Sequence, residues 1–206
     1  MLVINKQNSP KIIVIWLHGL TPKNHIPDFK NFIEILGFND IEFILPNAPL
    51  IPITVNQGLV MHGWYDIKSF KFEEHDIKGL HHSVSSIEKV IQDRLKKSNK
   101  NIKICLAGFS QGAAVSLFFA LNSLVKIDAV ISLSGYLPGS AKKILVPKIP
   151  MLALHGAHDD IINIDYAKKS FGKLINQDNF KLLTFNMGHE IILEQVAHIK
   201  QFLMRV

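Results

Sequence analysis

The sequence predicts an α/β fold with a mainly parallel central sheet and helices on both of its faces. Short, continuously apolar runs recur along the 206 residues, and such runs are typical of strands that are covered on both sides. Between several of these runs, apolar residues recur at the three-to-four spacing that indicates amphipathic helices. Strands and helices that alternate in this order pack as a parallel sheet with right-handed crossovers.

The first predicted strand, Ile12 to Leu17, is apolar throughout and rich in β-branched residues. The same pattern predicts strands over residues 41–45, 102–107, 129–133, 151–154 and 181–185. Predicted helices cover residues 76–97, 111–124, 165–176 and 191–203. In the helix that begins at residue 76, one apolar stripe is formed by Ile77, Leu80, Val84, Ile87, Ile91 and Leu95. No repeat or linker interrupts the alternation, so we expect a single domain over residues 1–206.

Residues 46–66 are the exception to this regular pattern. Prolines and glycines punctuate the segment, which nevertheless stays apolar. Long irregular loops in compact domains often form lids or binding walls. We therefore expect an irregular loop in which Leu59, Met61 and Trp64 contact a substrate. The alternative is that these side chains cover an edge of the core.

Composition excludes several classes of protein. Hydrophobic residues make up 48% of the chain and charged residues 19%, which excludes an intrinsically disordered protein. The net charge of +6 suggests nucleic-acid binding, but Arg94 and Arg205 are the only arginines and the lysines are scattered. Base and phosphate recognition favours arginine, so we expect no nucleic-acid partner.

Cellular location is also suggested by the sequence. The apolar run 12–17 is far shorter than the ~20 residues that cross a bilayer, and residues 1–10 lack the pattern of a secretory signal. The lone cysteine, Cys105, lies in an apolar run and is expected to be a buried thiol in a reducing compartment. We expect a cytoplasmic protein without integral membrane association.

The strongest local signal for function is Gly108-Phe109-Ser110-Gln111-Gly112. It follows a predicted strand and opens a predicted helix, which is the context of a G-x-S-x-G nucleophile elbow. The flanking glycines permit the sharp turn, because a β-carbon there would collide with neighbouring backbone. Ser110 is therefore the candidate nucleophile. The N–H of Gln111 lies at a helix N-terminus, where it can stabilise an oxyanion.

A serine nucleophile requires a histidine base that an acid orients. His189 follows the strand that ends at Phe185 and precedes the final helix, so it is the candidate base. Asp159 and Asp160 both follow the strand 151–154, and spacing alone does not separate them as the acid. The second oxyanion donor is expected after the first strand, where Leu20 can offer its N–H.

Other candidate chemistry is weaker. His18 either braces the loop before Leu20 or is a structural histidine with satisfied hydrogen bonds. His155 and His158 have ligand-like spacing, but no third ligand completes a zinc pattern. Neither a Walker loop nor a G-x-G-x-x-G motif is present. We expect no metal and no cofactor.

Taken together, these residues resemble the acyl-protein thioesterase/carboxylesterase family (the phospholipase/carboxylesterase group). The resemblance rests on segments at residues 17–20, 46–49, 63–66, 108–113, 133–138, 155–159 and 188–189. It implies an α/β-hydrolase fold, Asp159 as the acid, the N–H groups of Leu20 and Gln111 as the oxyanion hole, and a hydrophobic acyl site. It also implies a small-molecule ester or thioester, a lipidated protein or a lysophospholipid as substrate. Thr21-Pro22 departs from the family, which usually has Gly-Asp there.

The sequence thus predicts a serine hydrolase that cleaves carboxylic esters or thioesters through a Ser-His-Asp triad and an acyl-enzyme. The alternative is a non-catalytic binding or interaction protein on a hydrolase scaffold, for which the altered Thr21-Pro22 loop is the only support.

Overall fold

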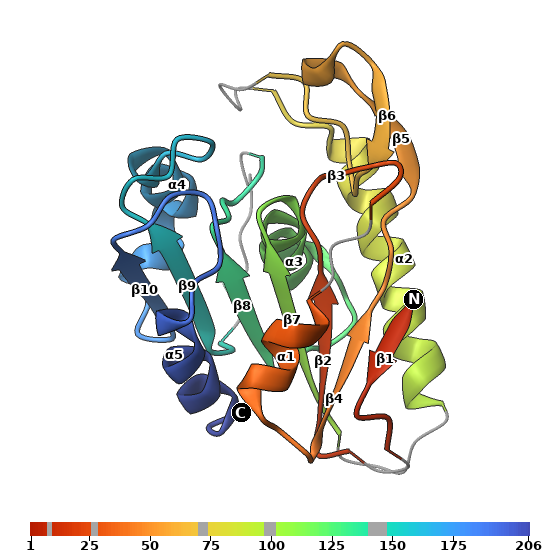
Figure 1. Cartoon of the computed structure of the whole chain (residues 1–206), viewed down its shortest axis with the longest axis vertical. Coiled ribbons are helices and arrows are strands. Elements are labelled where there is room, and N and C mark those ends of the chain that lie inside the picture. The colour runs from red at the N-terminus through yellow and green to blue at the C-terminus, as the bar shows by residue number, and fades with distance from the viewer. Residues whose placement is uncertain (8–9, 26–28, 70–73, 97–101, 140–147) are drawn as a thin grey trace.

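The computed structural model describes residues 1–7, 10–25, 29–69, 74–96, 102–139 and 148–206. Within these residues, a seven-stranded sheet has the strand order β1-β4-β2-β7-β8-β9-β10 (Figure 1). Its strands are β1 (Leu2–Ile4), β2 (Ile12–Leu17), β4 (Ile41–Leu45), β7 (Lys103–Phe109), β8 (Ala129–Leu133), β9 (Met151–Gly156) and β10 (Phe180–Phe185). The short edge strand β1 is antiparallel to β4, and the other pairs are parallel. The predicted parallel sheet is confirmed.

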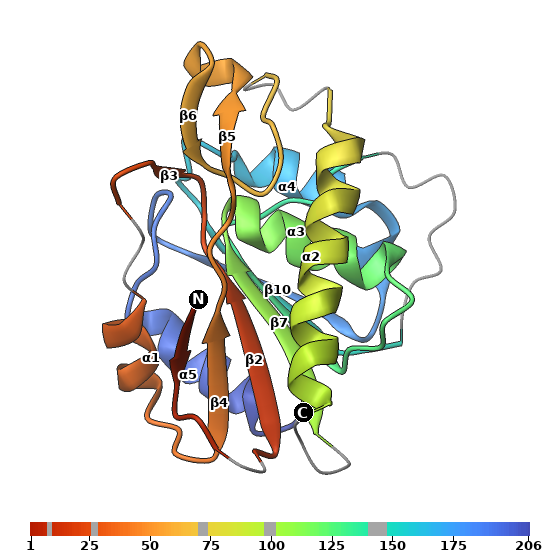
Figure 2. The ribbon, with the colours of Figure 1, turned by 90° about the vertical axis from the view of Figure 1, so that its right-hand side faces the viewer.

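Helices cover both faces of the sheet (Figures 1 and 2). Side chains of α1 (Lys30–Leu36) and α5 (Glu194–Leu203) pack against one face. Those of α2 (Ile77–Leu95), α3 (Gln111–Asn122) and α4 (Ile164–Phe171) pack against the other. None of the helices in the described part of the chain has the length and apolar character that a bilayer-spanning segment requires.

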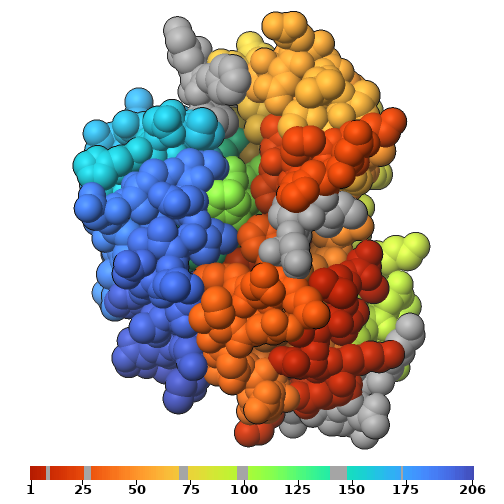
Figure 3. All heavy atoms as spheres, viewed as in Figure 1, coloured from red at the N-terminus to blue at the C-terminus, as the bar shows by residue number. Residues whose placement is uncertain are grey.

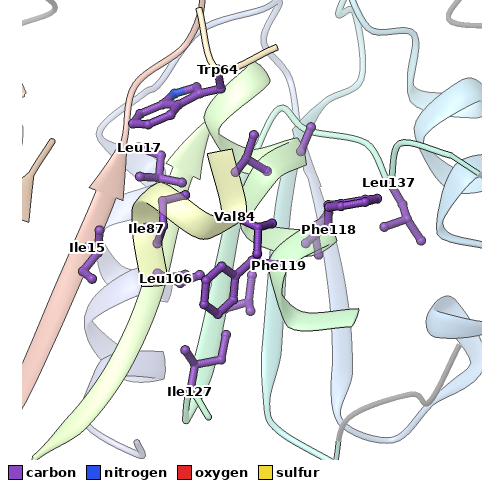
Figure 4. Close-up of a cluster of buried hydrophobic side chains, with 14 of the residues drawn as sticks. Ile15, Leu17, Trp64, Val84, Ile87, Leu106, Phe118, Phe119, Ile127 and Leu137 are labelled. Atoms are coloured by element: carbon purple, nitrogen blue, oxygen red, sulfur yellow. The ribbon is translucent and has the colours of Figure 1, made fainter. Parts of the chain in front are cut away.

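Strand β2 shows why a continuously apolar run predicts a central strand. All six of its residues are buried. Ile13, Ile15 and Leu17 belong to the cluster under α2 and α3, part of which is shown in Figure 4. The alternate residues Ile12, Val14 and Trp16 belong to the cluster under α1 and α5. Because side chains alternate along a strand, both faces need apolar residues.

The apolar stripe of α2 is buried only in its middle. Leu80, Val84, Ile87 and Ile91 are at most 4% exposed, whereas Ile77 and Leu95 at the two ends are 43% and 38% exposed. Asp76 caps the helix by accepting a hydrogen bond from the N–H of Gly79. The predicted end of this helix at Lys97 lies outside the described residues.

The prediction of an irregular loop over residues 46–66 is wrong. The segment contains β5 (Leu50–Ile53), the short 3-10 helix η1 (Thr54–Asn56) and β6 (Leu59–His62), which form a hairpin. With β3 (Thr21–Pro22), the hairpin makes a small second sheet of order β3-β6-β5. Proline in this segment suggested a loop, but Pro52 lies on the edge strand β5, where a missing N–H is tolerated.

The single helix predicted over residues 165–176 is two helical elements in the structure. Helix α4 ends at Phe171, and the 3-10 helix η2 (Gly172–Asn176) follows. Gly172 has φ +51°, which ends the regular α-helix at this point. The short elements α1 and β1 were not predicted, because neither shows a long enough apolar pattern.

The turn between β7 and α3 depends on two close backbone contacts. A β-carbon on Gly112 would lie 2.2 Å from the carbonyl oxygen of Leu17, and one on Gly108 would lie 2.4 Å from the carbonyl carbon of Gly112. Only glycine permits the start of α3 to approach the end of β2 this closely. The structure therefore supports the steric reason given for the glycines of the G-x-S-x-G motif.

We predict that Gly112→Ala destabilises the protein by about 3 kcal/mol or more, because backbone atoms rather than a flexible side chain must move. Urea unfolding followed by circular dichroism measures this change. Gly188→Ala is the control, since its β-carbon would lie 3.9 Å from the carbonyl oxygen of His158, an ordinary van der Waals contact, and its stability should stay near that of the unaltered protein. Equal stability of the two variants would contradict the steric argument.

Candidate active site

The predicted site residues meet at one edge of the parallel sheet. Ser110 follows β7, Asp159 follows β9 and His189 follows β10, so all three leave the carboxyl ends of their strands. Nε2 of His189 lies 2.8 Å from Oγ of Ser110, and Nδ1 of His189 lies 2.8 Å from Oδ2 of Asp159. Residues separated by 79 and 30 positions thus form one continuous chain of hydrogen bonds.

Ser110 has an uncommon backbone conformation. Its φ is 55° and its ψ is −118°, a combination that costs a non-glycine residue on the order of 1–3 kcal/mol. The N–H of Ser110 donates to the carbonyl of Leu133 on the neighbouring strand β8, which helps to hold the turn. The strained turn leaves the serine side chain at the surface of a cavity rather than in the core.

The tautomer of His189 follows from its partners. A carboxylate can only accept a hydrogen bond, so Nδ1 carries a proton and donates it to Asp159. In the neutral ring Nε2 is then the acceptor, and it receives the hydroxyl proton of Ser110. The ring packs against Phe109, with its centroid 4.9 Å from that of the phenyl ring. The imidazole is therefore already oriented to take a proton from the serine.

Asp159 and Asp160, which spacing alone did not separate, lie in different environments. Asp160 is exposed, whereas Asp159 is 3% exposed. Oδ1 of Asp159 accepts the N–H groups of Ile161 and Ile162 at 3.0 and 2.7 Å, while Oδ2 faces His189. Burial alone would raise the pKa of Asp159. The hydrogen bonds from His189 and Ile162 outweigh burial, so this pKa lies below its ordinary value.

A second histidine, His155, is buried and also contacts this carboxylate. Its Nε2 lies 2.7 Å from the carbonyl oxygen of Ile162 and 3.3 Å from Oδ2 of Asp159. Because a carbonyl can only accept, Nε2 carries the proton. Burial lowers the pKa of His155, so the ring is held neutral beside the acid. His158, its supposed partner in a metal site, is exposed and contacts Asn186 instead.

Two backbone segments face Ser110. Gln111 is the first residue of α3, where backbone N–H groups have no acceptor within the helix. Gly19 packs on the other side, since a β-carbon there would lie 3.2 Å from Cβ of Ser110. Leu20, which follows it, lines the same cavity as Ser110. The side chain of Gln111 has a separate role: it accepts from the N–H of Trp64 and donates to the carbonyl of Tyr65.

The cavity at Ser110 has a volume of about 310 Å³ and is mostly apolar. Beside Ser110 and His189, the cavity is lined by apolar and aromatic side chains, namely Leu20, Val55, Tyr65, Ile67, Phe109, Tyr136, Ile161 and Ile162. Figure 3 shows green atoms, the colour of this part of the chain, at the floor of a hollow between the red and blue ends. A second cavity of about 300 Å³ shares Leu20, Phe109 and His189 and extends to Glu190 and Ile191.

The structure does not bring Leu59, Met61 and Trp64 to the cavity at Ser110. Leu59 is 59% exposed on β6, and Met61 is buried within the small sheet. Trp64 is also buried, and its Nε1–H donates to the carbonyl of His18. Trp64 lines a different cavity, between the hairpin and α2. From the same segment, Val55, Asn56 and Tyr65 line the Ser110 cavity instead.

Ile161 and Ile162 also line this cavity, although they were not among the predicted site residues. Two consecutive isoleucines directly after the acid are a signal that could have indicated an apolar wall. In the described part of the chain, no group of three or more His, Cys, Asp or Glu side chains is placed to hold a metal ion.

Comparison with known proteins supports the fold. The solved structure of acyl-protein thioesterase 2 from Zea mays superposes with a TM-score of 0.84 at 24% identity, covering 99% of this chain and 97% of that one. The fold is that of the α/β hydrolases. The profile of the family described as Phospholipase/Carboxylesterase matches residues 1–206, and the chain belongs to this family.

Curated relatives extend the match to sequence. "Acyl-protein thioesterase 1 homolog 2" of Dictyostelium discoideum is 33% identical over 95% of this chain and 94% of its own length. "Acyl-protein thioesterase 1" of Aspergillus fumigatus is 32% identical over 94% of this chain and 87% of its own length. With the family match, these relatives identify the chain as a serine hydrolase that acts on ester bonds.

We predict that stability falls as the pH is lowered from 7 to 5. Burial lowers the pKa of His18, His75 and His155 in the folded protein, whereas unfolded histidines bind protons from about pH 6.5 downward. The unfolded state then holds more protons, so the free energy of unfolding decreases. The lowered pKa of Asp159 acts only below about pH 4, outside this window.

Urea unfolding at several pH values measures the slope. His155→Gln removes one of the three histidines and should make the slope shallower. His82→Gln alters an exposed histidine of α2 and should leave the slope unchanged. A wild-type stability that is constant between pH 5 and 7 would contradict the prediction.

Proposed function

We propose that Ser110, His189 and Asp159 form the catalytic triad of this hydrolase. The observation that supports it is the pair of 2.8 Å contacts that join Ser110 to His189 and His189 to Asp159. A serine hydroxyl becomes a competent nucleophile when a neutral imidazole can take its proton as it attacks. The arrangement of donors and acceptors at His189 meets this requirement.

The reaction proceeds through an acyl-enzyme. Oγ of Ser110 attacks the acyl carbonyl carbon while Nε2 of His189 takes the hydroxyl proton. The resulting oxyanion accepts hydrogen bonds from the N–H groups of Leu20 and Gln111. When the tetrahedral intermediate collapses, the bond to the leaving group breaks and His189 returns the proton to the departing alkoxide or thiolate. Water then attacks the acyl-serine in the same way and releases the carboxylic acid.

Asp159 keeps His189 in the productive tautomer and stabilises the imidazolium that forms during each step. Its low pKa means that it stays charged when the imidazole becomes positive. The two N–H groups from Ile161 and Ile162 fix the carboxylate, so that Oδ2 stays directed at the ring.

The substrate class that the site supports best is a thioester or ester with an apolar acyl chain. The cavity beside Ser110 has an apolar lining of leucine, valine, isoleucine and aromatic side chains. Two relatives are named acyl-protein thioesterases, so we propose the acyl thioester of a lipidated protein as the substrate. The cytoplasmic location expected from the sequence fits such a substrate and stays a prediction.

Ser110→Ala should lower the turnover of a p-nitrophenyl ester by roughly 10⁶-fold, because the nucleophile is lost. Asp159→Asn should lower kcat by about 10⁴-fold, because the asparagine favours the wrong imidazole tautomer. Asp160→Asn is the matched control: this carboxylate is exposed and one residue away, so activity should stay within twofold.

Labelling with a fluorophosphonate separates catalysis from mere binding. The unaltered protein should be labelled, and Ser110→Ala should not. A protein that keeps the hydrolase scaffold without turnover would resist the reagent. A fully active Ser110→Ala variant would remove the proposed mechanism.

Acyl-chain preference is the next prediction. Each buried methylene contributes about 0.8 kcal/mol, so kcat/KM should rise up to about fourfold per carbon from the acetate ester until the cavity is filled. A series of p-nitrophenyl esters from acetate to palmitate, together with a palmitoylated cysteine peptide, measures this preference. Ile161→Ser should weaken the response to chain length, whereas Leu59→Ser, on the exposed part of β6, should leave it unchanged. A response independent of chain length would contradict an acyl-binding cavity.

A further inference from the structure

The loop after β2 contains a carbonyl that is held from two sides. The carbonyl oxygen of Gly19 lies 2.6 Å from Nδ1 of His18 and accepts the hydroxyl of Thr21 at 2.9 Å. Both side chains are buried, with exposures of 5% and 3%. Two donors at these distances fix the plane of the peptide that joins Gly19 to Leu20.

The hydrogen bond at the other ring nitrogen of His18 shows that Nδ1 is the donor to Gly19. Nε2 of His18 accepts the backbone N–H of Ala48 at 3.0 Å. The proton of the neutral ring must then be on Nδ1, which donates it to Gly19. Burial lowers the pKa of His18, which favours this neutral form. His18 therefore braces the loop, one of the two roles considered for it.

Because the peptide bond is planar, the orientation of the Gly19 carbonyl also fixes the orientation of the Leu20 N–H. No described peptide bond is cis, and in a planar trans peptide the N–H points opposite to the preceding C=O. Holding the Gly19 oxygen towards His18 and Thr21 therefore turns the N–H of Leu20 away from them. Gly19 packs against Ser110, and Leu20 lines the cavity that contains Ser110.

We propose that Thr21 is a positioning residue for the oxyanion hole: through its hydroxyl bond to Gly19, it orients the N–H of Leu20. This inference rests on the proposed function, in which that N–H stabilises the oxyanion. Thr21 is also a residue at which the sequence departs from the resemblance noted in the sequence analysis, and its hydroxyl supplies the second donor to the Gly19 carbonyl.

The small sheet keeps Thr21 in place. Thr21 lies on β3 opposite His62 of β6, and His62 in turn contacts the carbonyl of Ala48 through Nδ1. Trp64 holds the preceding carbonyl, that of His18. Trp64 and Thr21 thus hold the consecutive carbonyls of His18 and Gly19, and Thr21 is the contact closest to Leu20.

Thr21→Val tests the proposal, because valine keeps the shape and removes the hydroxyl. We expect kcat for a p-nitrophenyl ester to fall about tenfold, less than the ~10²–10³-fold cost of losing an oxyanion donor outright, with KM unchanged. The inhibition constant of an alkyl trifluoromethyl ketone should rise by the same factor, because its adduct with Ser110 carries an oxyanion. Thr21→Ser keeps the hydroxyl and should restore most of the activity.

Thr184→Val is the matched control, since this threonine is exposed on β10, and its kinetics should not change. Thr21→Ala gives a second test if the valine variant does not fold, and here too kcat should fall while KM stays unchanged. An unchanged kcat in a folded Thr21 variant, or a Thr21→Ser variant as impaired as Thr21→Val, would overturn the proposal. If the proposed function itself is wrong, a different result would show it: the Ser110→Ala variant would remain active.

Discussion

The contact between the start of α3 and the end of β2 is the constraint on which the site depends. Gly112 lies so close to the carbonyl of Leu17 that a single added carbon would be only 2.2 Å from that oxygen. This approach brings the turn at Ser110 next to the loop at Gly19. It also puts Ser110 in a conformation that few non-glycine residues adopt. The interior of the surrounding sheet offsets that strain, because β2 and β7 are buried on both faces.

The charge of Asp159 is the second constraint. A carboxylate that is 3% exposed loses most of its contact with water, and such a group is stable as an ion only where hydrogen bonds replace the lost solvation. Two backbone N–H groups and His189 provide those bonds, with His155 close to the same oxygen. The acid is therefore held by its own loop, and its orientation does not depend on the substrate.

Much of this arrangement could be predicted because it follows local rules. Apolar runs gave the central strands, and the glycines around Ser110 gave the turn, since each depends on residues that are close in sequence. The order of strands also placed His189 at the correct edge. Asp159 and Asp160 could not be separated by spacing, because the difference between them is burial, which depends on how the loop folds back on Ile161 and Ile162.

The hairpin could not be predicted for a different reason. Pro52 indicates a loop when read locally, and it is compatible with a strand because β5 lies at the edge of the small sheet. Strand pairing between residues 21–22 and 61–62 is a tertiary property. The prediction that Trp64 contacts the substrate was wrong for the same reason. Its apolar ring suggested a substrate wall, but the indole N–H is hydrogen-bonded to the carbonyl of His18, which holds the side chain in the interior.

The hairpin is hydrogen-bonded to the site through the residues that follow β6, and its outer turn adds Val55 to the wall of the Ser110 cavity. The side chain of Gln111 holds the backbone of Trp64 and Tyr65, while Leu59 and Val60, further out, are 59% and 42% exposed. Substitutions at these exposed positions of β6 therefore leave the groups around Ser110 where they are. The outer turn itself carries Val55 and Asn56, so sequence changes there would alter the wall of the cavity beside Ser110 while leaving the hydrogen bonds of His189 to Ser110 and Asp159 in place.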